Sequence, residues 1–311
     1  MRTIVVVAVL AAFSGFEHPA VSAQSFPTFK SSVDVVPISA VVRDRRGRMV
    51  TTLASDDFEV LDKGERRPIL DFQIDQTSPI TMAVLVDVSG SMRLGSKLAL
   101  SREVLTHLVA DLREGRDEVG LFTFDDILHE QQAFTVHTTS IDAALNGAEP
   151  FGTTSLYDAI AETAQRLGAR PSRRRAIVVL TDGVDTSSAL TPSEVSSLAS
   201  AIDAPVYVVV TGPPIDRAAY LDRTTRRNAQ SPADLRDLAA WTGGDLLWVT
   251  PGENAALRAH QILSELRHQY LIAIESATDR EWRPIDVRVR DRRLSVRARS
   301  GYFSRDNALS R

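Results

Sequence analysis

An apolar run, 83–86, ends at a loop of short oxygen-bearing side chains, Asp87, Ser89 and Ser91. These three side chains stand two residues apart, and Gly90 makes the loop between them pliable. Carboxylate and hydroxyl oxygens are the ligands that hard cations such as Mg²⁺, Mn²⁺ and Ca²⁺ prefer. The spacing therefore indicates a loop whose oxygens converge on one divalent cation.

Two further segments carry oxygen ligands of the same kind. The apolar run 177–180 leads into Asp182, and the segment 152–155 places Thr154 and its neighbouring hydroxyls just before a predicted helix. Neither Asp87 nor Asp182 has a basic neighbour in the sequence, so the two carboxylates would repel one another unless a hard cation lay between them. We therefore expect all these groups to serve one metal site.

The elements that must position these residues follow an alternating pattern from Ile80 to about His268. Alternation of apolar strands with helices is typical of a doubly wound, mainly parallel α/β sheet with helices on both faces. Such sheets bind ligands beyond the carboxyl ends of their strands. We predict strands at 81–86, 119–124, 131–136, 176–180, 206–210 and 246–249, and helices at 97–112, 156–167, 192–201, 233–241 and 254–266.

Both ends of the chain show the period of two residues that indicates β-strands. The pattern covers residues 33–76 at one end and begins again near Tyr270 at the other. Neither end has enough strands to close a core alone. We therefore predict an N-terminal β segment, 24–77, and a C-terminal one, 269–311, which pack together as one small β module beside a central domain, 78–268.

The oxygen ligands and their order resemble the metal-ion-dependent adhesion site of von Willebrand factor A domains. The resemblance rests on Asp87-x-Ser89-x-Ser91, on the run Gly-Thr-Thr-Ser-Leu-Tyr-Asp at 152–158, and on Thr-Asp-Gly at 181–183. It implies a Rossmann-like fold for the central domain. It also implies a bound divalent cation, for which Mg²⁺ is the first expectation and Mn²⁺ or Ca²⁺ the alternatives.

The resemblance also implies a role for each residue. Ser89 and Ser91 would coordinate the ion directly, and Thr154 would do so directly or through water. Asp87 and Asp182 would act chiefly through water and hydrogen bonds. Thr154 is preferred to Thr153 because it stands two residues before the leucine of the motif, and the choice between the two threonines stays open.

The flanking β segments look like those of one branch of this family, the secreted von Willebrand factor A-related proteins of soil bacteria, of the Acidobacteria type. The residues that carry this likeness are 60–64, 269–271 and 297–303. They look structural, and they point to no ligand.

The first residues have the layout of a secretory signal. An apolar stretch from Thr3 to Phe16 follows Arg2, and small residues at Val21-Ser22-Ala23 suit a signal peptidase. We predict a signal peptide at 1–23 with cleavage after Ala23, and a periplasmic or extracellular location. The stretch is shorter than the roughly 20 residues of a membrane span, and no later run is long enough to span either, so no transmembrane span is expected.

Composition excludes several classes of site. The chain has no cysteine, so thiolate metal sites, thiol nucleophiles and disulfides are excluded. The formal net charge of −4 over 311 residues gives no global field that would favour nucleic acid as the partner. The stretch 280–305 is locally basic, with nine arginines against three acids, and such a run is most often the solvated side of two strands.

Three functions fit these features. The first is an exported, adhesion-like binding protein, not an enzyme, whose cation binds an Asp or Glu of a protein partner, with Met92, Thr153 and Val184 at the rim. The second is a scaffold protein with a structural metal. The third is a magnesium-dependent phosphatase, but its chemistry needs an acid two residues after the nucleophile, where Ser89 stands, and a suitably placed lysine, which we do not find in the sequence. The oligomeric state is not predicted.

Overall fold

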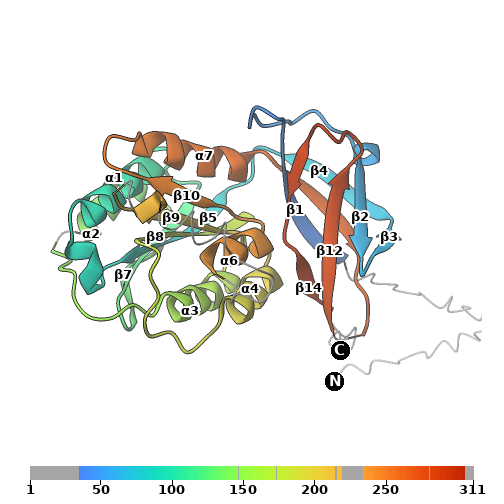
Figure 1. Cartoon of the computed structure of the whole chain (residues 1–311). Coiled ribbons are helices and arrows are strands. Elements are labelled where there is room, and N and C mark those ends of the chain that lie inside the picture. The colour runs from blue at the N-terminus through green and yellow to red at the C-terminus, as the bar shows by residue number, and fades with distance from the viewer. Residues whose placement is uncertain are drawn as a thin grey trace, which may run out of the picture. The chain divides into compact units, whose positions relative to one another are not determined.

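The computed structural model describes residues 35–145, 147–172, 174–213, 216–218, 234–279 and 281–304 (Figure 1). All of them lie within one compact unit of the chain. The predicted signal peptide and cleavage site lie outside the described residues. No helix among the described residues combines the length and the apolar character that crossing a membrane requires.

The central part of the chain contains a six-stranded sheet in which every neighbouring pair is parallel except the last, β6 with β7. Its strands, in spatial order, are β10 (Leu246–Val249), β9 (Val206–Thr211), β8 (Arg174–Thr181), β5 (Ile80–Asp87), β6 (Glu118–Phe124) and β7 (Leu128–Thr135). The doubly wound sheet predicted from the sequence is confirmed, including its antiparallel edge strand.

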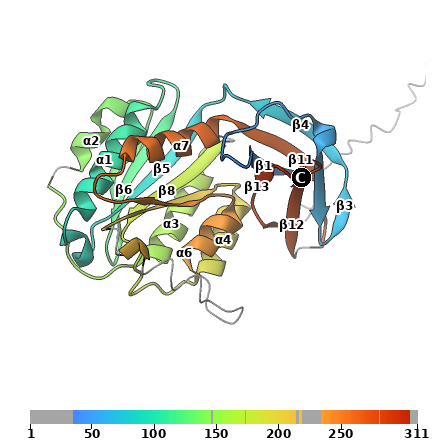
Figure 2. The same cartoon turned by 45° about the horizontal axis from the view of Figure 1, so that its top comes forward.

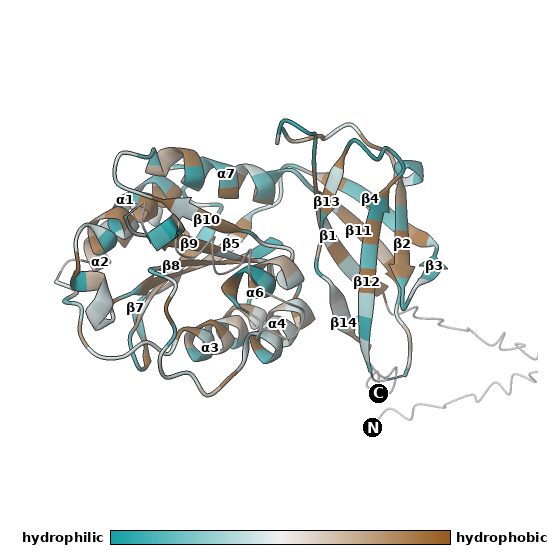
Figure 3. Cartoon of the chain, in the orientation of Figure 1, coloured by the Kyte–Doolittle hydropathy of each residue, from teal (hydrophilic) through white to brown (hydrophobic). Residues whose placement is uncertain are grey.

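Helices cover both faces of this sheet (Figure 2). One face packs against α1 (Lys97–Ala110), α2 (Ile141–Ala144) and α7 (Ala255–Arg267), and the other against α3 (Leu156–Gly168), α4 (Pro192–Ala201) and α6 (Leu235–Thr242). Strand β5 supplies both layers, because Met82 and Val84 enter one core and Ala83 and Leu85 enter the other. Being buried on both faces, β5 is apolar without interruption from Met82 to Val86 (Figure 3).

The two ends of the chain form two four-stranded sheets around a third core. One has the order β13 (Ser295–Arg297), β1 (Val35–Arg43), β11 (Gln269–Glu275) and β4 (Ile69–Asp75), and the other β14 (Gly301–Phe303), β12 (Trp282–Val289), β2 (Phe58–Asp62) and β3 (Glu65–Arg67). All pairs are antiparallel. N-terminal and C-terminal strands therefore build these sheets together, as predicted, and we call them the β module.

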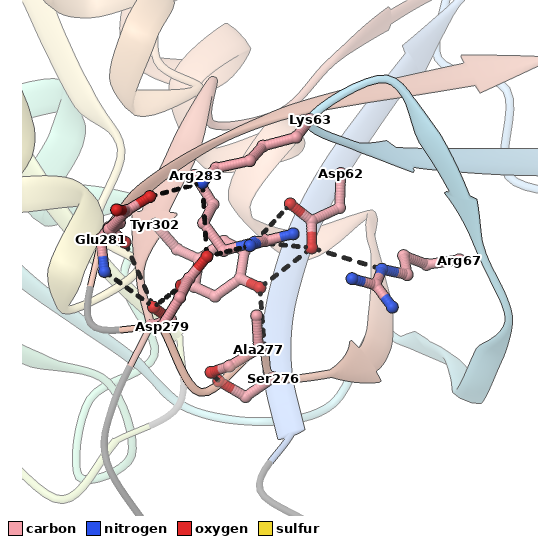
Figure 4. A network of polar contacts seen from close by, with 10 residues as sticks. Asp62, Lys63, Arg67, Ser276, Ala277, Asp279, Glu281, Arg283 and Tyr302 are labelled. Atoms are coloured by element: carbon pink, nitrogen blue, oxygen red, sulfur yellow. Dashed lines mark hydrogen bonds and ion pairs between the residues drawn. The ribbon is translucent and has the colours of Figure 1, made fainter.

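A charged network lies inside the β module (Figure 4). Asp62 at the end of β2 is fully buried, and both of its oxygens accept hydrogen bonds from Arg283 Nε, at 2.7 and 2.9 Å. The Tyr302 hydroxyl donates a further bond to Asp62 at 3.2 Å, and Arg67 forms an ion pair with it at 3.4 Å. Arg283 continues to Asp279. The network ties β2, β3, β12 and β14 together.

A second buried carboxylate, Asp117, lies where the chain enters and leaves the central sheet. Its Oδ1 accepts a hydrogen bond from the backbone N–H of Ile80, the first residue of β5, at 2.9 Å. Its Oδ2 accepts one from the guanidinium of Arg267, the last residue of α7, at 2.7 Å. One side chain thus holds together the two points at which the central domain joins the β module.

Candidate metal site

The candidate site lies at the carboxyl end of β5, in the middle of the central sheet. Strand β5 has β8 on one side and β6 on the other, and the chain turns away in opposite directions from this point. A doubly wound sheet opens a crevice where its strand order reverses in this way. Asp87, the last residue of β5, is fully buried there.

The Asp87 carboxylate is held by uncharged donors. Its Oδ1 accepts a hydrogen bond from the backbone N–H of Ser89 at 2.9 Å, and its Oδ2 accepts one from the Thr181 hydroxyl at 2.6 Å. Burial raises the pKa of Asp87 to about 6, and the charge of nearby Asp182 acts in the same direction, although the hydrogen bonds oppose both. Within the described part of the chain, no cationic side chain contacts this carboxylate.

The two serines of the loop lie close enough to share one ion. Ser89 Oγ and Ser91 Oγ are 3.2 Å apart, and adjacent ligands of an octahedral Mg²⁺ at 2.0–2.1 Å would lie about 3 Å apart. Ser89 is buried whereas Ser91 is partly exposed. The pair therefore has the spacing and the accessibility of two cis ligands.

The loop before α3 is hydrogen-bonded to the serine loop. Gly90 N–H donates to Gly152 O at 3.1 Å, and Phe151 N–H donates to Val88 O at 2.8 Å. Gly152 has a φ of +81°, which favours glycine, and a Cβ on Gly90 would lie 3.2 Å from the Gly152 oxygen. The two glycines allow the loops to approach this closely.

Thr154 and Thr153 differ in their surroundings. Thr154 is buried and its backbone N–H donates to the Thr186 hydroxyl at 2.9 Å, whereas Thr153 is exposed. Among the described residues, the Thr154 hydroxyl has no hydrogen-bond partner. Its oxygen is thus available to a ligand, on a loop that is already bonded to the loop of Ser89 and Ser91.

The fifth residue, Asp182, has a cationic partner that the sequence reasoning missed. Lys97 Nζ lies 2.8 Å from Asp182 Oδ2, and the two side chains are 13% and 3% exposed. Lys97 is not a neighbour of Asp182 in the sequence, and the fold brings the two side chains together. The position of Lys97 in the sequence could have indicated this pair. Lys97 is the first residue of α1, and helices that follow parallel strands begin at the edge of the sheet where those strands end.

The rim of the site also differs from the expectation. Met92 is 1% exposed and belongs to the interior, whereas Val184 and Thr153 are exposed as expected. Three further large apolar side chains are exposed on loops at this edge: Leu94, Ile127 and Phe151, the last to 75%. Their loops are bonded to one another, since Ser155 N–H also donates to Asp125 O at 2.7 Å.

The donor set suits a hard cation held mainly by hydroxyls. The described residues contain no group of three or more histidines and acids that could hold a metal without hydroxyl ligands. Hydroxyls of Ser89, Ser91 and Thr154 with two nearby carboxylates match the oxygen preference of Mg²⁺, Mn²⁺ and Ca²⁺. The residues present therefore fit a divalent cation.

Comparison with known proteins gives one family match, within the central sheet. The family model described as von Willebrand factor type A domain matches residues 82–184. No curated protein matches the chain. Among solved structures, an aerotolerance-related membrane protein from Bacteroides fragilis shares 21% identity at a TM-score of 0.48, over 60% of this chain and 98% of that one.

Two other solved structures are similar over a comparable length. Proximal thread matrix protein 1 from the mussel byssus, in a structure with a zinc-occupied MIDAS motif, shares 14% identity at a TM-score of 0.48, over 66% of this chain and 49% of that one. A von Willebrand factor type A protein from Catenulispora acidiphila shares 12% identity at a TM-score of 0.44, over 75% of this chain and 74% of that one.

Proposed function

We propose that this chain, which carries a von Willebrand factor type A domain at residues 82–184, is an exported binding protein and not an enzyme. Its divalent cation would bind an Asp or Glu side chain of a protein partner. Export rests on the signal-like layout of residues 1–23. Membership of the soil-bacterial branch stays a prediction.

In this proposal Ser89, Ser91 and Thr154 hold the cation through their hydroxyls, and Asp87 and Asp182 act through water and hydrogen bonds. The cation, Mg²⁺ in the first place, would supply an electrophilic point with an open position for an outside carboxylate. Neutral hydroxyls leave most of the charge of the cation uncompensated, so an anionic group from a partner is attracted.

The observation that carries the proposal is the buried Asp87 carboxylate, which has only neutral donors, beside a hydroxyl pair 3.2 Å apart. A buried carboxylate without a cationic partner is costly, and a bound cation would remove that cost.

The exposed apolar side chains around the site support protein binding rather than catalysis. Four large apolar side chains are exposed there, those of Leu94, Ile127, Phe151 and Val184. Exposed apolar side chains gathered on neighbouring loops are a feature of surfaces that another protein covers. We therefore infer that the partner's acid is flanked by apolar side chains.

A magnesium-dependent phosphatase is the less favoured function. Lys97 now stands beside Asp182, but the position that needs a second acid is still occupied by Ser89. A phosphatase therefore lacks its general acid. The scaffold alternative, with a structural metal, is separated from metal-dependent binding by the two experiments below.

The metal is tested first, by titration calorimetry of the full chain with MgCl₂, MnCl₂ and CaCl₂. We expect one site per chain in the wild type, and a loss of affinity of about tenfold or more when both Ser89 and Ser91 are replaced by alanine. Asp126→Ala, which removes an exposed acid from the same edge of the sheet, serves as the matched control. Equal affinity in the double variant and the wild type would contradict the metal site.

The partner is tested by capture from an envelope fraction of the host, with Mg²⁺ or with a chelator. We expect one set of proteins to be retained by the wild type with Mg²⁺ and released by chelator, and not retained by Asp87→Ala. Binding of the same proteins by a variant that has lost the metal would instead favour the scaffold.

A further inference from the structure

The segment 185–190, which follows the Thr-Asp-Gly run, is hydrogen-bonded to the loop of Thr154. The Thr154 N–H donates to the Thr186 hydroxyl at 2.9 Å, and the Thr154 carbonyl oxygen accepts the N–H groups of Thr186 and Ser187 at 2.9 and 3.0 Å. The Thr186 hydroxyl also donates to that oxygen, at 3.4 Å. Beside these bonds, the hydroxyls of Ser155 and Ser187 lie 2.9 Å apart. Both backbone groups of Thr154 are therefore bonded to one short segment.

These bonds fix the direction in which the Thr154 side chain leaves the backbone. The N–H of Thr154 belongs to the peptide plane before its Cα atom, and the carbonyl oxygen belongs to the plane after it. Because a residue has only two soft backbone dihedrals, one on each side of the Cα atom, holding both planes fixes the Cα–Cβ bond. The other loop contacts hold its neighbours instead, through the backbone of Phe151, Gly152 and Ser155. The bonds to segment 185–190 therefore set where the Thr154 hydroxyl can lie.

The same segment caps helix α3, which begins directly after the loop of Thr154. The first N–H groups of a helix have no partner inside it, and the residue before α3 makes no capping bond with its own side chain. Instead, Asp185 Oδ1 accepts the Leu156 N–H at 2.9 Å. Ser188 Oγ accepts the N–H groups of Tyr157 and Asp158 at 2.9 and 3.3 Å. The segment is thus anchored to a helix and has little freedom to move relative to Thr154.

The segment also begins beside a second residue of the candidate metal site. Asp182 stands four residues before Thr186 in the sequence, and its Oδ1 accepts the Val184 N–H at 3.3 Å. Thr154 and Asp182 come from different loops of the central sheet. One short run of chain, from Asp182 to the cap of α3, therefore places both of them.

We propose that Thr186 is a positioning residue of the metal site. Its hydroxyl and its N–H hold the backbone of Thr154 in the conformation that presents the Thr154 hydroxyl to the cation, and Thr186 itself does not coordinate the ion. Asp185 and Ser188 fix the segment from which Thr186 acts. This inference rests on the proposed function and deepens it, because it names a group outside the five site residues that sets the metal affinity.

A purely structural role for Thr186 predicts a different result, and Thr191 provides the comparison. Both threonines are exposed, and both hydroxyls accept a backbone N–H. Thr191 is the N-cap of α4, where it accepts the Glu194 N–H at 3.4 Å, and among the described residues it has no bond to the loop of Thr154. Loss of the Thr191 hydroxyl should therefore change the free energy of unfolding without changing the metal affinity of the folded chain.

The first experiment is titration calorimetry of the full chain with MgCl₂. Thr186→Val removes the hydroxyl and keeps the branched side chain, and we expect the affinity to fall about fivefold, as for the loss of one hydrogen bond. Thr186→Ser restores the hydroxyl and should return the affinity to within about twofold of the wild type. Thr191→Val should also stay within about twofold, although it loses stability to urea.

A double-mutant cycle tests whether Thr186 acts through Thr154. Thr154→Ala removes the hydroxyl that would bind the cation but keeps the backbone groups that Thr186 holds. We expect Thr186→Val to cause no further loss of affinity in the Thr154→Ala background, because the positioned hydroxyl is already gone. A further fivefold loss in the double variant would show that Thr186 acts by another route and would overturn the proposal.

A second measurement needs no metal. Hydrogen exchange followed by mass spectrometry should show faster exchange of residues 151–157 in Thr186→Val than in the wild type, because the Thr154 N–H loses its acceptor. Exchange of the same residues in Thr191→Val should match the wild type. Unchanged exchange in Thr186→Val would overturn the proposal whether or not the chain binds metal.

The outcomes separate this inference from the proposed function. Unchanged Mg²⁺ affinity in Thr186→Val, or no recovery in Thr186→Ser, would overturn the role of Thr186 and leave the metal site in place. A wild-type chain that binds none of Mg²⁺, Mn²⁺ and Ca²⁺ would overturn the proposed function, and the role of Thr186 in metal binding with it.

Discussion

Asp62 in the β module and Asp87 in the central sheet are both 0% exposed, but their counterions differ. Asp62 lies among Arg283, Arg67 and Tyr302, so its charge is compensated inside the chain (Figure 4). Asp87 has a backbone amide and a hydroxyl as donors and no cation. Buried charge is retained only when something compensates it.

The difference suggests what each carboxylate is for. The charge of a buried carboxylate that has its own arginine is compensated within the chain, and such a pair holds strands together. The charge of a buried carboxylate without an arginine is compensated only when a cation binds from outside. Asp182 lies between these cases, because Lys97 pairs with it at 2.8 Å at the edge of the same site.

The largest effect is expected from Asp62→Ala. It leaves buried Arg283 without its main counterion, and breaking a buried pair in this way typically costs about 3–5 kcal/mol. We expect that loss in the free energy of unfolding, measured with urea. Asp286→Ala removes an exposed pair with Arg288 and should cost less than about 1 kcal/mol. Equal losses in the two variants would show that the Asp62 network is not structural.

Metal binding should have the next largest effect. A cation at about 100 times its dissociation constant stabilises the folded chain by about 2.7 kcal/mol. We expect MgCl₂ to raise the melting temperature of the wild type, as measured by calorimetry, and to leave that of Asp87→Ala unchanged. Asp62→Ala lies outside the site, so it should still respond to MgCl₂ wherever it folds. An equal rise in the melting temperature of Asp87→Ala would contradict the proposal that Asp87, unlike Asp62, has a bound cation as its counterion.

A smaller effect is expected from Gly152→Ala. The residue has a φ of +81°, and a non-glycine residue in the left-handed region costs roughly 1–2 kcal/mol. Gly47→Ala meets similar strain, at +76° and with open space around it, but on a turn of the β module. We expect similar losses of stability by urea unfolding, and a weaker metal affinity by calorimetry only for Gly152→Ala. If both variants bind metal like the wild type, the loop contact does not shape the site.

The smallest effect is expected from Lys97→Met. Removing the ammonium frees Asp182 and removes a like charge beside the cation, so Mg²⁺ should bind more tightly by about 1 kcal/mol, or roughly fivefold. Calorimetry measures it directly. Lys97→Arg keeps the charge and should stay near the wild-type affinity. Weaker binding in Lys97→Met would mean that Lys97 helps to position Asp182 for the metal.

The sequence predicted the central domain well because its pattern is local. Strands buried on both faces, such as β5 and β8, contain uninterrupted apolar runs, 82–86 and 176–180, and the helices between the strands are long. Strands β3 and β14 were not predicted as separate strands. The five site residues follow a known spacing, whereas their function as metal ligands stays a prediction.

The missed features depend on contacts between distant residues. Lys97 meets Asp182 across 85 positions of the chain, and Arg283 meets Asp62 across 221. No local pattern of charge predicts either pair. Met92 was placed at the rim because of its position in the loop, but the short 3-10 helix at Gly90–Arg93 turns it inward. Adjacency in sequence thus agrees with the exposure of Thr153 and Val184 and was wrong for Met92.

The two hydrogen bonds that Asp117 accepts, from Ile80 and from Arg267, have a consequence for the order of folding. Strands β4 and β11 pair although the whole central domain separates them in sequence, and closing so long a loop is slow and entropically costly. Asp117 holds both Ile80, just after β4, and Arg267, just before β11. Once the central domain has folded, it holds the end of β4 close to the start of β11, as a short turn would. The β module can then close as a late and local step, although its strands come from both ends of the chain.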